Sequence, residues 1–438
     1  MDRSRHGRTG ETQSPNGTRP GRARQRALMV GVMRAPAGEA RGSGEDMAEL
    51  EELLRTAGVA VVGRIVQHRD MPHPNTYVGP GKLEEIKAAA KALDANLVAC
   101  DDELTPRQER NLEQELSDVP VVDRTTVILD IFAGHANSAE GKLQVELAQL
   151  QYNLARMRGL WTHLERLGGG IGTRGPGESQ IETDRRLARD RISALKRRLR
   201  DVQGSREVMR AERERAGLTR VALAGYTNAG KSTLLNALTG AEVGVGDRLF
   251  HTLDPTTRQL EVHGRRYLVT DTVGFIRKLP HQLVEAFGAT LEETTLADLV
   301  LHVVDASVEE KEMLAMLRAV EDVLEEIGAG DRTRILVLNK ADVLDDDRRS
   351  ELGFRHPDGV LVSAATGEGL EALAGQIDEA FRRTLRSIDL LVPYAEGARL
   401  AELHDIAGEL EREDTAEGVR IRARVPATVA ERFAAYAR

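Results

Sequence analysis

The chain has 438 residues, of which 41% are hydrophobic and 30% are charged, and its formal net charge is −9 at pH 7. This length exceeds one ordinary hydrophobic core, so about two to four domains are expected. The composition is that of a soluble globular protein, and no apolar run approaches the length of a membrane span. The acidic balance argues against a general attraction to nucleic acid, although local basic stripes matter more than the sum.

The only cysteine, Cys100, ends the short strand-like run 96–99. One thiol cannot form an internal disulfide, so a reducing compartment fits best. Because free cysteine is among the most buried residue types, Cys100 is interpreted as a small buried hydrophobic residue and not as a nucleophile.

The first 26 residues are rich in arginine and have almost no apolar side chains. Such a segment cannot bury enough surface to fold alone. The bias toward Arg and Ser raises the alternative of a transit peptide, but there is no amphipathic apolar stripe and no signal-type hydrophobic region. We therefore expect a disordered basic tail.

From residue 27 to about 137, strand-like and helical patterns alternate. The strand-like runs lie at 27–32 and 59–66, and the helical patterns lie at 47–55, 82–93 and 106–116. This alternation predicts a small α/β domain. Its Gly/Pro cluster TYVGPGK, residues 76–82, is interpreted as a turn; the alternative is a set of backbone amides near an anion at a helix start.

The segment from 138 to 218 has a heptad period. Two stretches have apolar residues spaced alternately by four and three: Leu143, Leu147, Leu150, Leu154, Met157, Trp161 and Leu164, then Ala188, Ile192, Leu195, Leu199 and Val202. Between them lies GGGIGTRGPGES, residues 168–179, which is too rich in Gly and Pro to continue a helix. The pattern predicts two antiparallel helices joined by a mobile, exposed tip.

Basic residues crowd the second of these helices outside its heptad positions. They are Arg185, Arg186, Arg189, Arg191, Lys196, Arg197, Arg198 and Arg200. One interpretation is a solvated charged face. The other is contact with RNA, because cations beside a glycine-rich tip that carries Arg174 suit a phosphate backbone.

The strongest signal is GYTNAGKS, residues 225–232, which follows an apolar run and precedes the helical TLLNALTG. Strand, loop and helix in this order are what a Walker A motif, or P-loop, requires. Gly225 and Gly230 let backbone amides close around phosphates, and Lys231 reaches the β- and γ-oxygens. Ser232 supplies a hydroxyl to Mg²⁺. A nucleoside triphosphate site is therefore predicted.

Base specificity is predicted from NKAD, residues 339–342, which follows another apolar run. Asp342 can accept from N1–H and N2–H₂ of guanine, Asn339 can meet the N7 edge and brace the P-loop, and Lys340 can lie over the ring. Adenine lacks that pair of donors and would leave the acceptors unpaired, at about 1–3 kcal/mol each. SAATGEG, residues 363–369, would add backbone contacts to guanine O6.

Two segments between the P-loop and NKAD have the pattern of nucleotide-sensing switches. In FHTLDPTTR, residues 250–258, the hydroxyl of Thr252 is expected to meet Mg²⁺, with Thr256 and Thr257 as alternatives. In DTVGFI, residues 271–276, Asp271 is expected to hold Mg²⁺ through water, and the amide of Gly274 to sense the γ-phosphate. His251 is interpreted as a surface histidine.

Phe275 stands where many signalling GTPases carry a glutamine that orients water. A phenyl ring cannot accept a proton from water or orient it, so intrinsic turnover should be slow. Completion of a GTPase site from outside is worth roughly 10³ to 10⁵ in rate, which leaves a partner ample scope to act as activator.

The last segment, residues 387–438, predicts a small α+β appendage: a strand, a helix at 398–410, a strand at 419–425 and a short helix. The alternating arginines of the strand at 419–425 are interpreted as an exposed strand face. Contact with rRNA or protein is the alternative.

Together these patterns predict an α/β protein built around a P-loop GTPase domain with a mostly parallel, doubly wound sheet, because each nucleotide motif follows a strand. The expected units are a disordered tail at 1–26, an α/β domain at 27–137, a helical hairpin at 138–218, a G domain at 219–386 and a C-terminal α+β domain at 387–438. Lys231, Thr252 and Gly274 are the expected catalytic residues, and Ser232 and Thr252 the metal ligands. The predicted nucleotide-binding set is Gly225, Tyr226, Thr227, Asn228, Ala229, Gly230, Lys231, Ser232, Phe250, His251, Thr252, Leu253, Asp254, Asp271, Thr272, Val273, Gly274, Asn339, Lys340, Ala341, Asp342, Ser363, Ala364 and Ala365.

Several of these motifs together resemble the HflX-type GTPases, within the translation-factor-related branch of the P-loop GTPases. They are TYVGPGK, GGGIGTRGPGESQIETDRR, GYTNAGKS, TLDPTT, DTVGFIRKLPH and NKAD, and the similarity spans roughly residues 27 to 438. The resemblance implies a cytoplasmic GTPase of bacterial type, monomeric off the ribosome, that binds the large ribosomal subunit and its rRNA. Its N-terminal and helical regions would reach toward the peptidyl transferase centre. Relatives dissociate stalled or idle ribosomes, particularly under heat stress.

The resemblance also bears on the cofactors. It implies Mg²⁺ at the phosphates, and a K⁺ ion held through Asn228, because similar P-loop asparagines in related GTPases help coordinate K⁺. Two other functions stay open at this stage. One is a GTP-regulated ribosome assembly factor that acts on precursor particles, and the other is a non-ribosomal switch that uses its heptad helices to bind a helical protein.

Overall fold

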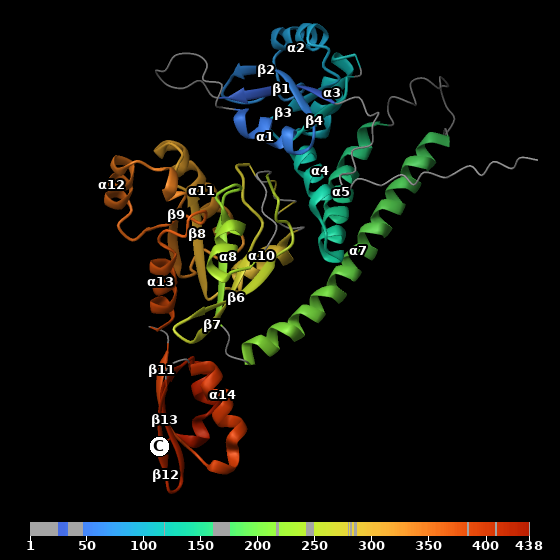
Figure 1. Ribbon diagram of the computed structural model, residues 1–438. Helices are drawn as coiled ribbons and strands as arrows, with labels where there is room; N and C mark the ends of the chain where they lie inside the picture. Colours follow the sequence, from blue (N-terminus) through green and yellow to red (C-terminus); the bar gives the residue numbers. More distant parts are fainter. Residues whose placement is uncertain are drawn as a thin grey trace, which may run out of the picture.

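The computed structural model describes residues 25–33, 47–117, 119–160, 176–215, 219–241, 249–278, 280, 283, 287–382, 385–407 and 410–437. Within these residues the strands form three sheets. Figure 1 shows the sheets one above another, with the N-terminal sheet at one end, the C-terminal sheet at the other and a long helix running beside them.

The N-terminal sheet is wholly parallel and has the strand order β2-β1-β3-β4. Its strands are β1 (Arg26–Met33), β2 (Ala60–His68), β3 (Leu97–Cys100) and β4 (Val121–Asp123). Helices α1 (Ala48–Thr56) and α4 (Arg124–His135) cover one face, and α2 (Pro80–Ala92) and α3 (Pro106–Glu115) cover the other. Both faces are covered, which explains the nearly continuous apolar strands. Cys100 is buried, as expected.

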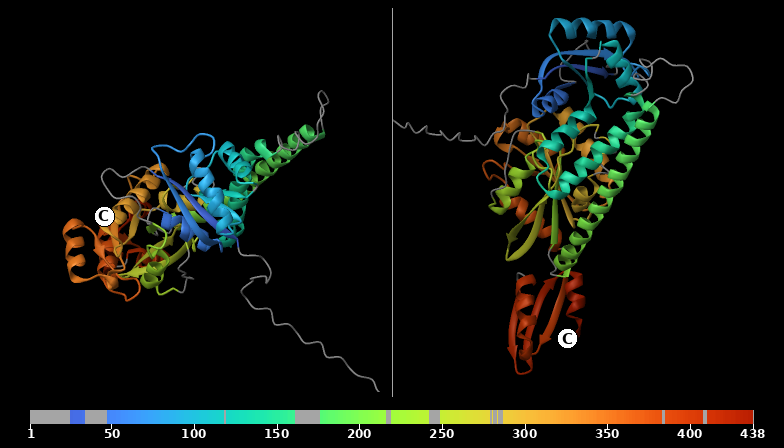
Figure 2. Two further views of the ribbon diagram at one scale, coloured as in Figure 1. Left: turned by 90° about the horizontal axis from the view of Figure 1, so that it is seen from above. Right: turned by 90° about the vertical axis from the view of Figure 1, so that its right-hand side faces the viewer.

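Two long helices follow, α5 (Ala139–Leu160) and α7 (Pro176–Arg215), and they lie against each other (Figure 2). Their seam consists of Leu143, Leu147, Leu195 and Leu199, with Leu150 and Ile192 partly buried beside them. α7 begins at Pro176, so the end of the predicted loop 168–179 is helical; proline suits the first position of a helix. Residues 161–175, with Trp161, Leu164 and Arg174, lie outside the described residues.

The central sheet confirms the predicted fold class. Its order is β10-β9-β8-β5-β7-β6, and every neighbouring pair is parallel except β6 and β7. The strands are β5 (Thr219–Gly225), β6 (Thr256–Val262), β7 (Arg265–Asp271), β8 (Leu299–Asp305), β9 (Arg334–Asn339) and β10 (Val360–Leu361). Because β5, β7 and β9 end at Gly225, Asp271 and Asn339, the predicted motifs share one edge of the sheet.

Helices cover both faces of the central sheet. α8 (Lys231–Thr239) and α13 (Leu370–Arg382) pack on one face. α10 (Gly288–Thr295) and α11 (Glu310–Glu326) pack on the other, and α12 (Asp346–Arg355) contributes Leu352 to a small core beside α11. A short 3-10 helix, η2 (Ala341–Val343), follows β9.

One apolar cluster joins the N-terminal unit to the G domain, and we call it the interdomain core. It includes buried residues of β1, α1, α4 and α5 together with residues of β5, α10 and α11. At its centre the ring of Phe132 makes edge contacts with Phe250 at 4.7 Å and Phe287 at 4.8 Å between centroids. The phosphate edge of the central sheet is therefore packed directly against a neighbouring unit.

The C-terminal sheet is antiparallel, with the order β11-β13-β12. Its elements are β11 (Arg386–Val392), η3 (Tyr394–Glu396), α14 (Gly397–Ala407), β12 (Leu410–Thr415), β13 (Gly418–Val425), α15 (Ala427–Arg432) and η4 (Ala434–Tyr436). The predicted helix at 398–410 was wrong at its end, because a strand begins at Leu410. That strand is charged and exposed, and its acidic side chains lie opposite arginines of β13.

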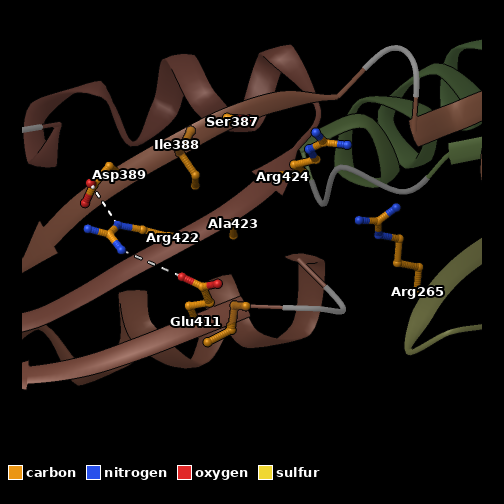
Figure 3. Close-up of a pocket in the computed structure, with 9 residues that line it drawn as sticks. Arg265, Ser387, Ile388, Asp389, Glu411, Arg422, Ala423 and Arg424 are labelled. Atoms are coloured by element: carbon orange, nitrogen blue, oxygen red, sulfur yellow. Dashed lines mark hydrogen bonds and ion pairs between the residues drawn. The ribbon is translucent and has the colours of Figure 1, made fainter.

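Figure 3 shows this charged face: Arg422 lies between Asp389 and Glu411. Arg420 donates to the carboxylate of Asp389 as well. Arg420 and Arg422 thus take part in cross-strand ion pairs, which offset like-charge repulsion along the strand.

The predicted unit boundaries fall at different kinds of place in this structure. The boundary at 137/138 lies between α4 and α5, whereas the one at 386/387 lies one residue inside β11. Across the described ranges, no helix is both long and apolar enough to cross a membrane.

Candidate nucleotide-binding site

The P-loop, residues 225–232, connects β5 to α8 at the carboxyl edge of the central sheet. Gly230 has φ of 89°, and a Cβ there would lie 2.3 Å from Nδ2 of Asn339, so only glycine fits. Nζ of Lys231 donates to the carbonyls of Gly225 (3.0 Å) and Tyr226 (2.9 Å). Burial lowers the pKa of Lys231 to about 8, and the nearby carboxylate of Asp271 opposes that shift.

Three oxygen-bearing side chains meet beside the P-loop. Oγ of Ser232 donates to Oδ2 of Asp271 at 2.5 Å and lies 2.8 Å from Oγ1 of Thr252. Oδ1 of Asp271 is buried and has no hydrogen-bond partner among the described residues. Burial raises the pKa of Asp271, while Lys231 and Ser232 lower it. Two hydroxyls and an unsatisfied carboxylate oxygen form a donor set that fits Mg²⁺, which prefers hard oxygen ligands.

Of the three candidate threonines, Thr252 is the one whose hydroxyl contacts Ser232 in the described part of the chain. Thr256 and Thr257 belong to β6, where the hydroxyl of Thr257 lies 2.9 Å from that of Thr270 in β7. In the ladder between β6 and β7, Thr256 lies opposite Asp271 and Thr257 lies opposite Thr270.

The base end of the site is connected to the P-loop through Asn339. Its Nδ2 donates to the carbonyl of Ala229 at 2.8 Å, and its Oδ1 accepts from the amide of Ala364 at 3.1 Å. Asp342 accepts from the hydroxyl of Ser363 at 2.6 Å. The structure thus brings NKAD, SAA and the P-loop together, as their shared edge predicts.

Lys340 has φ of 67° and pairs with Asp305 of β8 at 2.5 Å. The side chain of Lys340 is therefore held by another strand of the G domain. Ala341 is buried, and its amide donates to the carbonyl of Val362.

The second switch segment, residues 271–276, runs beside the P-loop. The amide of Thr227 donates to the carbonyl of Phe275 at 2.8 Å, and the amide of Phe275 donates to Gly225 at 3.1 Å. The ring of Phe275 is only 1% exposed and lies in the interdomain core. The position that carries glutamine in many GTPases therefore holds a core side chain here. Gly274 lies within this hydrogen-bonded stretch, and Thr272 and Val273 are buried.

The first switch segment is divided between the site and its neighbours. His251 is exposed, as predicted, and its ring lies 6.5 Å from that of His135. Phe250 and Leu253 are buried in the interdomain core, and Asp254 bonds to residues that precede α5. Their side chains are engaged by α4 and α5, so any contact of these three residues with nucleotide falls to the backbone.

Sequence reasoning missed two acidic residues of α1 that contact the P-loop. The hydroxyl of Tyr226 donates to Glu49, and Nδ2 of Asn228 donates to Oε1 of Glu52 at 3.0 Å. The partners are 177 and 176 positions apart, so no local pattern connects them. The buried guanidinium of Arg124 bonds to Glu49 and, at 3.1 Å, to the carbonyl of Arg277.

Lys278, which follows Arg277, also contacts the N-terminal unit. Nζ of Lys278 lies 2.6 Å from Asp102 and 3.0 Å from Asp101. Those carboxylates raise the pKa of Lys278, although burial opposes them. The segment after the second switch is thus tied to the N-terminal unit by charge.

The P-loop forms one end of the site, and the carboxylate of Asp342 lies at the other end. Their arrangement on one edge of a parallel sheet defines the class, a P-loop GTPase.

Comparison with known proteins narrows that class. Family models described as GTP-binding GTPase N-terminal, GTP-binding GTPase middle region and 50S ribosome-binding GTPase match residues 44–133, 135–213 and 220–340. A GTPase HflX of Lacrimispora saccharolytica is 47% identical over 404 residues, covering 92% of this chain and 94% of its own. One from Caldanaerobacter subterraneus is 44% identical over 413 residues, covering 94% of each chain, and one from Escherichia coli K12 is 46% identical over 387 residues, covering 86% and 89%.

The chain therefore belongs to the HflX family of GTPases. It is an enzyme that hydrolyses GTP to GDP and phosphate.

Proposed function

We propose that this GTPase binds the large ribosomal subunit through rRNA, in the cytoplasm, and dissociates stalled or idle ribosomes, with hydrolysis stimulated by the ribosome. The observation that carries the proposal is the outer face of α7. Its exposed cations include Arg186, Arg189, Lys196, Arg197, Arg198 and Arg200, whereas Leu195, Leu199 and Ile192 of the same helix pack against α5. A row of guanidinium groups on a rigid helix suits a phosphate backbone.

A second observation supports stimulation by a partner. Phe275 is buried in the interdomain core, so its side chain supplies no group that orients water. Lys231 stabilises charge on the phosphates and Gly274 offers its amide to the γ-phosphate, but the attacking water has no partner from position 275. The ribosome would supply or arrange that group, as trans-acting partners do in other GTPases.

The proposal includes the residues that would hold Mg²⁺ and K⁺. Ser232 and Thr252 would hold Mg²⁺ directly, and Asp271 would hold it through water. The ion, when bound, neutralises charge that develops on the phosphates. Asn228 would hold K⁺ through its amide oxygen, because its Nδ2 is already committed to Glu52. Exchange of K⁺ for Na⁺ without any change in turnover would remove the K⁺ assignment.

The test is GTP turnover with and without purified large subunits. We expect stimulation of about 10³-fold, at the low end of the range for trans activation. The variant Arg197→Glu/Arg198→Glu should keep basal turnover and lose most of the stimulation. A matched control, Lys311→Glu/Arg318→Glu, reverses two exposed cations on α11 and should behave as the unmodified chain.

Sedimentation separates the rival functions. With GTP, the chain should convert intact ribosomes into subunits. Exclusive association with precursor particles would favour an assembly factor. Turnover that is indifferent to subunits and to the α7 charges would favour a switch with a protein partner and would overturn the proposal.

A further inference from the structure

The start of α5 receives a side chain from the first switch segment. The carboxylate of Asp254 accepts from the amides of Asn137 (3.1 Å) and Ser138 (2.8 Å) and from the hydroxyl of Ser138. The Ser138 hydroxyl oxygen in turn accepts from the amide of Gly141 at 2.8 Å. A carboxylate is favoured at a helix start, where backbone amides lack intrahelical partners. Asp254 thus caps α5 from 116 positions away.

The space for this carboxylate depends on Gly141. A Cβ at that position would lie 2.5 Å from Oδ1 of Asp254 and 3.1 Å from Oγ of Ser138. Real Cβ atoms do not approach an oxygen that closely, so a larger residue would displace Asp254. The first turn of α5 is therefore shaped around the switch side chain.

The first switch segment, which carries Asp254, also contacts the proposed Mg²⁺ ligand Ser232. Thr252, two residues before Asp254, lies 2.8 Å from Ser232 through its hydroxyl. Phe250 and Leu253 are each 2% exposed in the interdomain core. The stretch is consequently fixed on one side by α4 and α5 and on the other by the P-loop serine.

We propose that Ser138 and Gly141, through Asp254, are positioning residues for GTP hydrolysis. They touch no nucleotide themselves; they hold the segment that presents Thr252 beside Ser232. A shift of the start of α5 would move Asp254 and with it Thr252. The inference rests on the proposed role of Thr252, and it makes the base of the helical pair part of the hydrolytic machinery.

The test is single-turnover GTP hydrolysis in the full chain without ribosomes, with KM for GTP and the affinity for GDP measured alongside. Gly141→Ala and Asp254→Asn should each lower the single-turnover rate constant by about tenfold or more, with KM and GDP affinity changed by less than about twofold. Gly134→Ala is the matched control, since an added Cβ on α4 meets nothing within 4 Å, and it should retain the full rate.

Measurements in a Thr252→Ala background distinguish a positioning role of Ser138 and Gly141 from a role in stability alone. There Gly141→Ala should lower the rate no further, because its effect passes through Thr252. Ser138→Ala adds no bulk and should reproduce the defect, and Ser138→Thr, which keeps the hydroxyl, should restore most of the rate. Ser138→Ala also decides the matter if Gly141→Ala fails to fold.

The inference is overturned if Asp254→Asn and Ser138→Ala turn over GTP at the full rate, or if the defect persists undiminished in the Thr252→Ala background. A parallel loss of GDP affinity would also overturn it. Ribosomes are absent from these assays, so their outcome is independent of the subunit-stimulation test of the proposed function.

Discussion

The two ends of the nucleotide site are held in different ways. The base end is braced within the G domain, where Asn339 joins Ala229 and Ala364, and Asp342 bonds to Ser363. At the phosphate end, contacts come from other units. Glu49 and Glu52 reach the P-loop, and Asp254 of the first switch is held at the start of α5.

Base selectivity and GTP hydrolysis should therefore depend on different parts of the molecule. A pocket braced from within one domain keeps its base selectivity whatever the neighbouring units do. A phosphate end packed into the interdomain core responds to them, because packed cores change between discrete arrangements and do not deform continuously. Selectivity should therefore be local, whereas turnover should depend on the N-terminal and helical regions.

The largest effect is expected for GTP affinity at Asp342, at the base end of the site. Asp342→Asn replaces the charged group that we propose accepts from two guanine donors, so GTP affinity should fall roughly 100-fold to 1000-fold, or about 3–4 kcal/mol. The rate at saturating GTP should change much less, because the phosphate contacts are intact. Calorimetry with GTP and ATP measures the affinities. Equal affinity of the unmodified chain for the two nucleotides would contradict the assigned base contact.

The pH dependence of binding tests the phosphate side. The pKa of Lys231 lies near 8 because of burial, and bound phosphates should raise it, since opposite charge favours the protonated form. Above pH 8 binding must then take up a proton, so GTP affinity should fall by up to about tenfold per pH unit; below about pH 7 it should be flat. Lys231→Arg stays protonated and should flatten the profile of GTP dissociation constants. A flat profile of GTP affinity against pH in the unmodified chain would contradict a pKa near 8 for Lys231.

A smaller effect tests the contact between α1 and the P-loop. Tyr226→Phe removes the donor to Glu49 and the acceptor for the amide of Arg277, a bond of 2.9 Å. We expect a loss of about 1–2 kcal/mol in the free energy of unfolding and a fall of a few-fold in kcat, with the preference for GTP over ATP unchanged. Thermal unfolding and turnover assays measure both. A changed base preference would argue against separate bracing of the two ends.

The sequence anticipated one part of this arrangement well and another poorly. The P-loop, Asp271 and NKAD follow strands of one parallel sheet, so their meeting at one edge follows from topology. The contacts of Glu49, Glu52 and Ser138 depend on how separate units pack, and no local periodicity records that. β12 was missed for a related reason: its charged residues pair with arginines of β13, and charge alone does not indicate a strand.

We infer that hydrolysis, and not base recognition, depends on contacts from outside the G domain. Single-turnover GTP hydrolysis and the ratio of GTP to ATP affinity, measured on one Tyr226→Phe/Asp254→Asn variant, test it most directly. We expect a rate at least about tenfold lower with an unchanged affinity ratio. A ratio that falls in step with the rate, or a rate that stays the same, would contradict it.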